Sequence, residues 1–369
     1  MKSCSSPNIN KWLLSLEKEF DFKSNEYESL FSEADATIFQ SPYWLDAFYS
    51  CLVEALSVEP VIITLRDETD RLQLVLPCIR QQSGGIKIVQ PADMGVSDYN
   101  CIVARNNAIE AILASNELQN NIVKALMPYD VFIFRKQRSD KPRIEEILIG
   151  ASISAADFNS YEVELEGSFE AWSRQNMSKQ FRSTNRAKLK KLNAQIGSCQ
   201  FETLFDKASV EKAMAFIRDN RSSRYEGDLL LQPAFFNFYR TIAVEYAKDG
   251  FAQTFAARIN GEIVAAVFGL NLNGRYCFLL CGFLFDELGK YSIGGLTTSE
   301  LIRDRVEIGS KIFDFALGDE NYKKRYNTRA IEIQNAVYTN SMAGTLVSLV
   351  YQNAKPLKNL LKKFNPKLS

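Results

Sequence analysis

Three apolar segments joined by two short turns decide the fold: FAQTFAARI (251–259), Asn260-Gly261, EIVAAVFGLNL (262–272), Asn273-Gly274 and RYCFLLCGFLF (275–285). An Asn-Gly pair supplies the positive φ angles of a two-residue type I′ turn, which is the strongest short-range signal for a hairpin. The sequence therefore predicts a three-stranded antiparallel meander.

The segments after the meander predict a loop, a helix and further strands. The glycine-bearing stretch GKYSIGG (289–295) leads into TTSELIRDRVEI (297–308), whose pattern is helical and which Gly309 ends. KIFDFAL (311–317) predicts a short apolar strand, and IEIQNAVY (331–338) alternates like another strand.

The first half repeats this order of elements. Strand-like segments at 58–66, 72–80 and 86–90 precede a helical stretch at about 108–126 and a strand at 130–134. We therefore expect an α/β protein with two similar units in tandem, at residues 1–150 and 151–340. A basic helical tail is expected at 341–369, where Leu357, Leu360, Leu361 and Phe364 recur at helical spacing.

Composition excludes several kinds of chemistry. The 369 residues contain no histidine, which rules out a Ser-His-Asp triad and any histidine-ligated metal, and no metal is expected. Lys+Arg and Asp+Glu both number 44, so bulk attraction to nucleic acid is not indicated. Seven scattered cysteines, a polar start and no long apolar run predict a cytoplasmic protein.

A basic amphipathic stretch, MSKQFRSTNRAKLKKL (177–192), separates the halves. Phe181, Leu189 and Leu192 share one helical face, while Arg182 and Arg186 share another. A solvated helix is the default interpretation, and binding of a nucleotide phosphate, an acidic polymer or RNA are the alternatives. The tail at 355–363 either packs on the body of the protein or contacts an anionic membrane surface.

Several of these segments, in this order, resemble a known group of enzymes. They are WSRQNMSKQFRSTNRAKLKKL (172–192), RSSRY (221–225), the meander, GKYSIGGL and FDFALGDENYKKRY (313–326). In the first half, FQSPYWLDAF (39–48), LQLVLPCIR and SDY (97–99) also fit. The chain resembles acyltransferases of the CelD/BcsL type in the GNAT superfamily, relatives of the FemAB peptidyltransferases. The resemblance implies two GNAT-like units, each a mixed, mostly antiparallel sheet flanked by helices, and an acyl-CoA donor.

The glycine loop is the candidate site for that donor. A glycine-rich turn that enters a helix exposes backbone N–H groups at the positive end of the helix dipole, which favours phosphate. The residues expected to bind the donor are Lys290, Ser292, Gly294, Gly295 and Thr297. A plain turn is the alternative, and the loop's spacing differs from the widespread GNAT pattern.

The loop that follows the strand at 311–317 is the candidate for proton transfer. Acyl transfer to an amine needs a base, for which Asp319 and Glu320 are the carboxylates at hand. Tyr322 is expected to protonate the leaving thiolate, because a phenol has a higher pKa than a thiol. The alternative is a polar loop in which Asp319 caps a turn.

Basic and polar side chains near these segments are candidates for binding the acceptor. Arg221 and Arg224, three residues apart, would clamp an anionic group, or else form surface ion pairs with Asp219 or Glu226. The other predicted acceptor residues are Lys323, Asp98 and Tyr99, the last two in a loop expected to reach an interface between the units.

The sequence thus predicts an N-acyltransferase that moves an acyl group from acyl-CoA to an amine. The resemblance suggests an amino sugar or a precursor of the cell envelope or of a polysaccharide as the acceptor. Two alternatives stay open. One is a peptidyltransferase that uses aminoacyl-tRNA, and the other is a non-catalytic module for polysaccharide assembly, which the first unit already resembles because it lacks a glycine loop.

Overall fold

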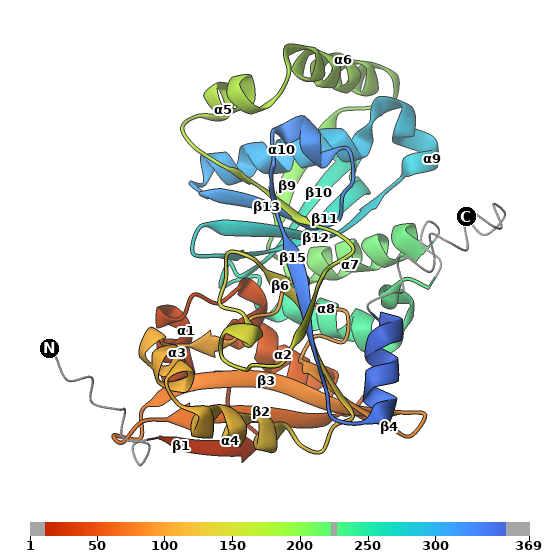
Figure 1. Cartoon of the computed structure of the whole chain (residues 1–369). Coiled ribbons are helices and arrows are strands. Elements are labelled where there is room, and N and C mark those ends of the chain that lie inside the picture. Colours follow the sequence, from red (N-terminus) through yellow and green to blue (C-terminus); the bar gives the residue numbers. More distant parts are fainter. Residues whose placement is uncertain (1–11, 223–226, 352–369) are drawn as a thin grey trace, which may run out of the picture. The chain divides into compact units, whose positions relative to one another are not determined.

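A computed structural model of the chain describes residues 12–222 and 227–351 (Figure 1). The chain divides into two compact units, one formed by residues 1–158 and 332–369 and the other by residues 159–331. Each unit has its own sheet and its own apolar core. No helix in the described part of the chain is long and apolar enough to cross a membrane.

Unit 1 is built on a sheet with the strand order β1-β2-β3-β4-β6-β15-β7, to which β5 adds beside β3. All neighbours are antiparallel except β4 and β6. The strands are β1 (Leu13–Glu17), β2 (Glu59–Arg66), β3 (Leu72–Ser83), β4 (Ile86–Pro91), β5 (Val103–Ala104), β6 (Val131–Arg138), β7 (Ser152–Ala155) and β15 (Ile333–Thr339). The helices are α1 (Asn25–Glu33), α2 (Pro42–Cys51), α3 (Asn106–Leu113), α4 (Asn116–Leu126) and a last helix at 342–351.

Unit 2 has a seven-stranded sheet in the order β14-β8-β13-β12-β11-β10-β9, in which β12 and β13 are the parallel pair. Its strands are β8 (Ser160–Glu164), β9 (Cys199–Leu204), β10 (Ala252–Ile259), β11 (Glu262–Leu272), β12 (Arg275–Phe283), β13 (Ile312–Leu317) and β14 (Arg329–Ile331). Its helices are α5 (Phe169–Asn176), α6 (Lys179–Gln195), α7 (Lys207–Ser222), α8 (Pro233–Glu245), α9 (Phe285–Leu288) and α10 (Ile293–Glu307).

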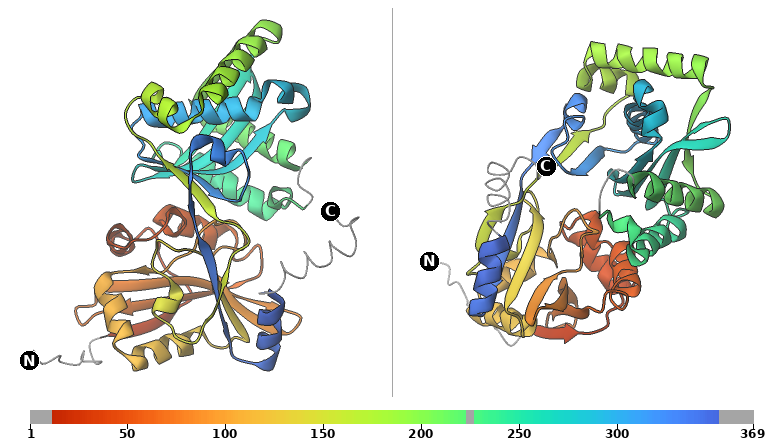
Figure 2. Two further views of the ribbon diagram at one scale, coloured as in Figure 1. Left: turned by 45° about the horizontal axis from the view of Figure 1, so that its top comes forward. Right: turned by 90° about the vertical axis from the view of Figure 1, so that its right-hand side faces the viewer.

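The helices of unit 2 cover both faces of its sheet. α7 and α8 pack on one face, against β10, β11 and β12, while α10 packs on the other. Figure 1 shows α5 and α6 beyond α10 on that second face, and the two views of Figure 2 agree. The face under α10 carries a core of aromatic side chains that includes Tyr276, Phe313, Phe315 and Tyr326.

The meander predicted from the Asn-Gly pairs is confirmed, and the turns explain it. Asn260 and Asn273 have φ angles of 51° and 50°, and the glycines that follow have 83° and 77°. These are the left-handed conformations of a type I′ turn, so β10, β11 and β12 follow one another as neighbours. The helix predicted before Gly309 is also confirmed as α10, and Gly309 has the positive φ of a helix-ending glycine.

The predicted repeat of meander, helix and strand is present in both sheets. β2, β3 and β4 correspond to β10, β11 and β12, and β6 corresponds to β13, because each is the parallel partner that follows the helices. Next to that strand, each sheet takes one strand from elsewhere in the chain. This is β15 in unit 1 and β8 in unit 2. The predicted strand at 331–338 thus exists as β15, but it belongs to the first sheet.

Two details of the first half differ from the expected elements. The helical stretch at 108–126 is two helices, α3 and α4, because the Ser115 side chain accepts a hydrogen bond from the Leu118 N–H and starts a new helix. The units are also divided at 158 and 331 rather than at 150 and 340. The predicted tail lies within the described residues only as far as 351, where it is helical from 342.

Candidate functional site

The parallel strands β12 and β13 pair over only part of their length. Their ladder joins Arg275, Tyr276 and Cys277 to Ile312, Phe313 and Asp314, although β12 continues to Phe283 and β13 to Leu317. Beyond Asp314 the backbone of β13 is irregular. Ala316 has a φ of 59°, and its N–H donates to the Asp314 carboxylate at 2.8 Å. The two strands therefore leave each other's ladder at Asp314.

Helix α10 lies between β12 and β13 in the chain. The chain makes a short 3₁₀ turn at Gly289–Tyr291, Ser292 is left-handed with a φ of 58°, and α10 begins at Ile293. The amides of Ile293, Gly294 and Gly295 belong to the first helical turn, where no carbonyl of the same helix precedes them. The predicted donor loop is thus the start of a 15-residue helix.

The two glycines at this helix start differ in the space around them. A Cβ atom at Gly294 would lie 3.2 Å from the Phe283 ring, which is tighter than an ordinary contact. A Cβ at Gly295 would meet only the Ser292 Cβ, at 3.9 Å. A side chain at Gly294 would therefore press on the Phe283 ring, whereas one at Gly295 has room.

The other residues predicted to bind the donor are arranged differently. Lys290 is exposed, and its ammonium lies 5.1 Å from the centre of the Tyr291 ring. The Ser292 hydroxyl accepts a hydrogen bond from the Lys188 ammonium. Thr297 is fully buried, and its hydroxyl has no partner among the described residues. The structure therefore brings together Ser292 and the two glycines, with Lys290 on the surface beside them.

The hydroxyl of Tyr326 lies against the same helix start. It is 3.2 Å from the Ser299 Oγ and 3.4 Å from the Gly295 carbonyl oxygen. The Tyr326 ring packs between Phe315 of β13, at 5.3 Å, and Phe181 of α6, at 5.5 Å. Burial raises the pKa of Tyr326 to about 12, so the phenol keeps its proton at neutral pH.

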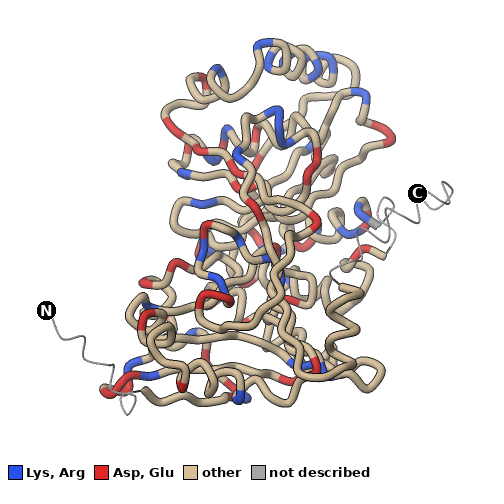
Figure 3. The backbone as a smooth tube through the Cα atoms, in the orientation of Figure 1, with Lys and Arg blue, Asp and Glu red and all other residues tan. Residues whose placement is uncertain are grey.

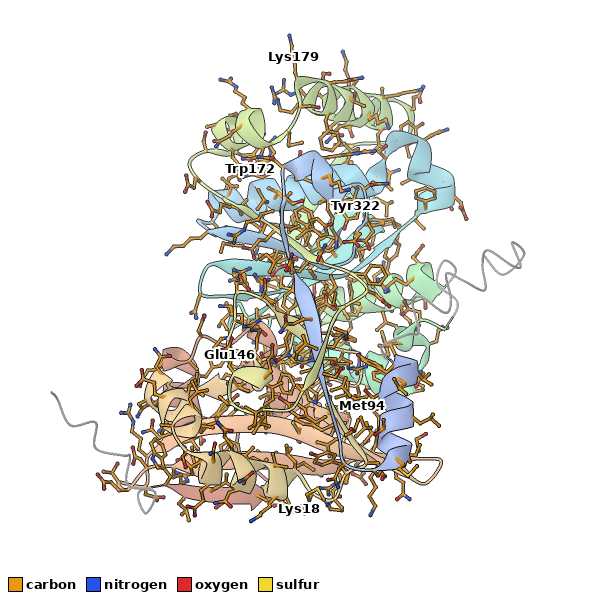
Figure 4. The ribbon with its side chains drawn as sticks, viewed as in Figure 1. Lys18, Met94, Glu146, Trp172, Lys179 and Tyr322 are labelled. Carbon is orange, nitrogen blue, oxygen red and sulfur yellow. The ribbon has the colours of Figure 1, made fainter. Side chains whose placement is uncertain are left out.

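The predicted catalytic residues lie after β13 and are more exposed. The Asp319 carboxylate accepts from the Tyr161 hydroxyl at 2.9 Å and from the Asn159 N–H at 3.3 Å. Glu320 is also exposed and pairs with Lys323 at 3.0 Å. Tyr322, labelled in Figure 4, is half-buried, and its ring meets the Phe315 ring in an edge arrangement with the ring centres 6.2 Å apart.

The residues predicted to bind the acceptor do not form one group. Lys323 is buried, and its ammonium donates to the carbonyls of Ala316, Leu317 and Gly318, so it holds the end of β13. Arg221 pairs with Asp228 at 2.9 Å. Arg224 lies outside the described residues.

The remaining two predicted acceptor residues belong to unit 1. Asp98 is half-buried. Tyr99 is buried, and its ring lies against the Arg138 guanidinium.

A buried charge cluster lies at the fork, the point at Asp314 where β12 and β13 leave each other's ladder. Its carboxylates and its central arginine are on β8, β12 and β13. Glu162 and Asp314 are 3% and 1% exposed and are directly opposite each other in the β8–β13 ladder. One nitrogen of Arg275 donates to both, at 2.6 and 3.1 Å, and Arg329 donates to Glu162 at 2.5 Å. Two buried carboxylates side by side need such cations, because burying an unpaired charge is costly.

Sequence reasoning missed Tyr326, Ser299 and Asp314. Asp314 carries a readable signal, since it is the one charged residue in the apolar strand IFDFAL. Tyr326 lies four residues after Tyr322 in the same quoted motif, and only the fold decides which of the two rings points under α10. Among the described residues, no group of three His, Cys, Asp or Glu could hold a metal ion.

Comparisons with known proteins agree with this geometry. Residues 179–324, from α6 into the loop after β13, match the model of the acetyltransferase (GNAT) domain family. No curated protein matches the chain.

Solved structures share the fold over most of the chain. The structure of FemX is 12% identical and covers 88% of this chain and 97% of its own, with a TM-score of 0.61. L-PGS from Bacillus licheniformis is 11% identical, with coverages of 91% and 98% and a TM-score of 0.54. The N-myristoyltransferase of Saccharomyces cerevisiae with bound myristoyl-CoA is 8% identical, with coverages of 91% and 85% and a TM-score of 0.50. The chain is therefore an acyltransferase that carries a GNAT acetyltransferase domain, as its resemblance to the GNAT superfamily predicted.

Proposed function

We propose that unit 2 transfers an acyl group from an acyl-CoA to an amine, without a covalent enzyme intermediate. The observation that carries this proposal is the position of the Tyr326 hydroxyl, beside the first turn of α10 and next to β13 where it leaves the ladder of β12. The proposed anion site at the start of α10 and the buried Tyr326 phenol then belong to the same region of unit 2. Acyl-CoA, when bound, supplies an activated thioester.

The residues of the chain fit such a donor. The first-turn amides at Ile293, Gly294 and Gly295 are proposed to hold its diphosphate, because they lie at the positive end of α10. Backbone amides on the facing edges of β12 and β13, past the end of their ladder, are proposed to hold the thioester carbonyl. The myristoyl-CoA bound in the N-myristoyltransferase of similar fold supports a CoA donor.

Proton transfer is assigned to two kinds of group. Tyr326 is proposed to protonate the sulfur as the bond between the sulfur and the acyl carbon breaks, because its raised pKa of about 12 keeps the phenol protonated at neutral pH. A carboxylate takes the proton of the attacking amine. Asp319 and Glu320 stay our first candidates for this base, and Asp314, at the fork, is the further one.

The acceptor is proposed to be the amine of an amino sugar or of a glycan or cell-envelope precursor. Of the predicted acceptor residues, Arg221 stays in this proposal, whereas the Lys323 ammonium already holds three carbonyls. Unit 1 is proposed to be non-catalytic, because its β4 ends at Pro91 and α3 begins only at Asn106, without a glycine loop between them.

Aminoacyl transfer from tRNA is the second candidate. The likeness to FemX over 88% of the chain favours it. It would use the same fork, since both reactions pass an acyl group to an amine.

The thermal midpoint of the full chain separates these donors. It is measured with coenzyme A, acetyl-CoA, longer acyl-CoAs and aminoacyl-tRNA, each in large excess. A ligand at about 100 times its Kd stabilises the folded state by about 2.7 kcal/mol, which is a shift of a few degrees at this size. We expect a shift with the acyl-CoAs that Gly294→Leu abolishes and that a surface control, Lys212→Ala, retains. A shift with tRNA alone would replace the CoA proposal by the second candidate.

A further inference from the structure

Helix α6 carries positive charge that the rest of the described chain does not neutralise. Its 17 residues include no acid and six bases, namely Lys179, Arg182, Arg186, Lys188, Lys190 and Lys191. Within residues 12–222 and 227–351, no carboxylate pairs with any of the six. Figure 3 shows this run of basic residues along α6. Because the whole chain has a net charge of zero, such a concentration is local rather than a property of the composition.

Other arginines of unit 2 are mostly paired, which sets α6 apart. Those with a carboxylate partner are Arg218, Arg221, Arg240, Arg258, Arg275, Arg303, Arg305 and Arg329. Among the described arginines of this unit, those without one are Arg174 in α5, Arg182 and Arg186 in α6, and Arg325 after β13. Arg325 lies over the ring of Phe181, so it too is beside α6.

Polar contacts hold α6 over the start of α10. Asn185 donates to the Ser299 Oγ at 3.0 Å, and Lys188 donates to the Ser292 hydroxyl. Further along α6, Gln195 accepts from the Tyr291 hydroxyl at 2.9 Å. Leu192 is the fully buried anchor of this face. These contacts fix α6 beside the proposed donor site, with the Lys188 ammonium on Ser292, the residue that precedes α10.

A groove of about 130 Å³ runs between α5, α6 and α10. Phe169, Met177, Leu189 and Leu296 give it apolar walls, and Ser299, the partner of Tyr326, also lines it. Three guanidinium groups lie along it. Arg303 is bound to Glu170 and Glu300, while Arg182 and Arg186 have no acid.

Arg182 is built into this groove rather than free on its surface. Its guanidinium donates to the carbonyls of Ser173, Arg174 and Met177, which fixes it where α5 turns into α6. Arg186 lies one helical turn further on and has no such tie among the described residues. It is therefore the guanidinium that an added anion would engage.

We propose that α6 and this groove bind the phosphorylated nucleotide end of the donor, with Arg186 on its phosphomonoester. This rests on the proposed acyl-CoA function and extends it to a second contact region, away from the first turn of α10. A guanidinium group matches a phosphate with two parallel hydrogen bonds, and the apolar walls suit a flat base. Ser299 lines the groove and is hydrogen-bonded to Tyr326, so the groove adjoins the proposed site.

Calorimetric binding of three ligands to the full chain tests the inference. The ligands are coenzyme A, 3′-dephospho-coenzyme A, which lacks the phosphomonoester, and pantetheine, which lacks all phosphates. We expect the wild type to prefer coenzyme A over the dephospho form by about tenfold or more. Arg186→Ala should remove most of that preference and leave the affinity for the dephospho form nearly unchanged.

The matched control is Lys179→Ala on the same helix, because Lys179 is not among the residues that line the groove (Figure 4). It should keep the preference, and melting temperatures check that both variants are folded. Equal affinity for the two nucleotides, or a preference that survives Arg186→Ala, overturns this inference while the CoA donor stands. If no CoA derivative binds and an RNA hairpin binds through Arg186 instead, both the inference and the CoA donor fail.

Discussion

Tyr326 and Tyr322 are the two phenols available to protonate the leaving thiolate. Tyr326 touches the first turn of α10, through the Gly295 carbonyl, whereas Tyr322 lies against Phe315. We expect Tyr326→Phe to lower kcat by about 100-fold with little change in acyl-CoA affinity, because it removes a proton donor and leaves the ring. Tyr322→Phe should keep most of the activity. Release of free thiol measures turnover and calorimetry measures binding, and the reverse ranking of the two variants would move the role to Tyr322.

The buried carboxylate of Asp93 makes the stability of unit 1 depend on pH. Burial alone would raise its pKa, but Arg135 and Lys136 outweigh burial and hold the pKa at about 2. A carboxylate whose folded pKa is lowered stabilises the fold above its unfolded pKa, and this stabilisation is lost as the pH falls from about 4 to 2. It amounts to about 2 kcal/mol at neutral pH.

In the Asp93→Asn variant, the free energy of unfolding of unit 1 should fall less between about pH 4 and pH 2 than in the wild type. Urea unfolding at several pH values measures this. An unchanged acid transition in the variant would show that other groups cause it.

At the level of single residues, the sequence could place the loops of the site but not all of its side chains. The glycine pair and the GDENYKKRY motif are found where expected, because they follow elements whose ends are readable. Which tyrosine turns under α10, and that Lys323 turns inward to three carbonyls, depends on the irregular backbone at Ala316. No residue pattern in the segment FDFALG predicts the positive φ angle of Ala316.

Among the elements, β12 and α7 approach each other closely at one glycine. A Cβ atom at Gly282 would lie 2.8 Å from the Cα of Ile217 and 3.2 Å from its carbonyl oxygen. Backbone cannot give way as a side chain does, so Gly282→Ala should destabilise unit 2 by about 1–3 kcal/mol. Gly295→Ala, where the space is open, is the control and should cost little. Denaturant unfolding measures both, and equal stabilities would mean that this approach is not close in solution.

The sequence predicts the strands of unit 2, but it does not predict which residues of α6 contact the rest of the unit. The Asn-Gly turns and apolar runs mark β10 to β12 and β13, since each strand is buried and bounded by turn residues. The basic stretch was predicted as a helix, and α6 confirms it. That Asn185, Lys188 and Gln195 also face inward could not be read from charge, because their polar contacts add to the apolar packing of this helix.

For the whole molecule, the order of strands in the two sheets explains why the domain boundaries were hard to predict. β15 follows unit 2 in the sequence but pairs with β6 and β7 of unit 1. A chain that ends after Ile331 should therefore lose the cooperative unfolding of unit 1 and keep that of unit 2. A chain that ends after Tyr351 should keep both, because Val347 and Tyr351 still pack against unit 1. Calorimetry of the two chains checks this, and intact unit 1 unfolding in the shorter chain would contradict the strand assignment.

Above all, we propose that unit 2 binds an acyl-CoA at the start of α10 for acyl transfer. Hydrogen exchange of the full chain with and without acetyl-CoA and a longer acyl-CoA tests it most directly, because exchange reports on individual backbone amides. We expect slower exchange in residues 289–299 and in the segment after β13, with unit 1 unchanged. No protection with any acyl-CoA, or protection confined to unit 1, would contradict it.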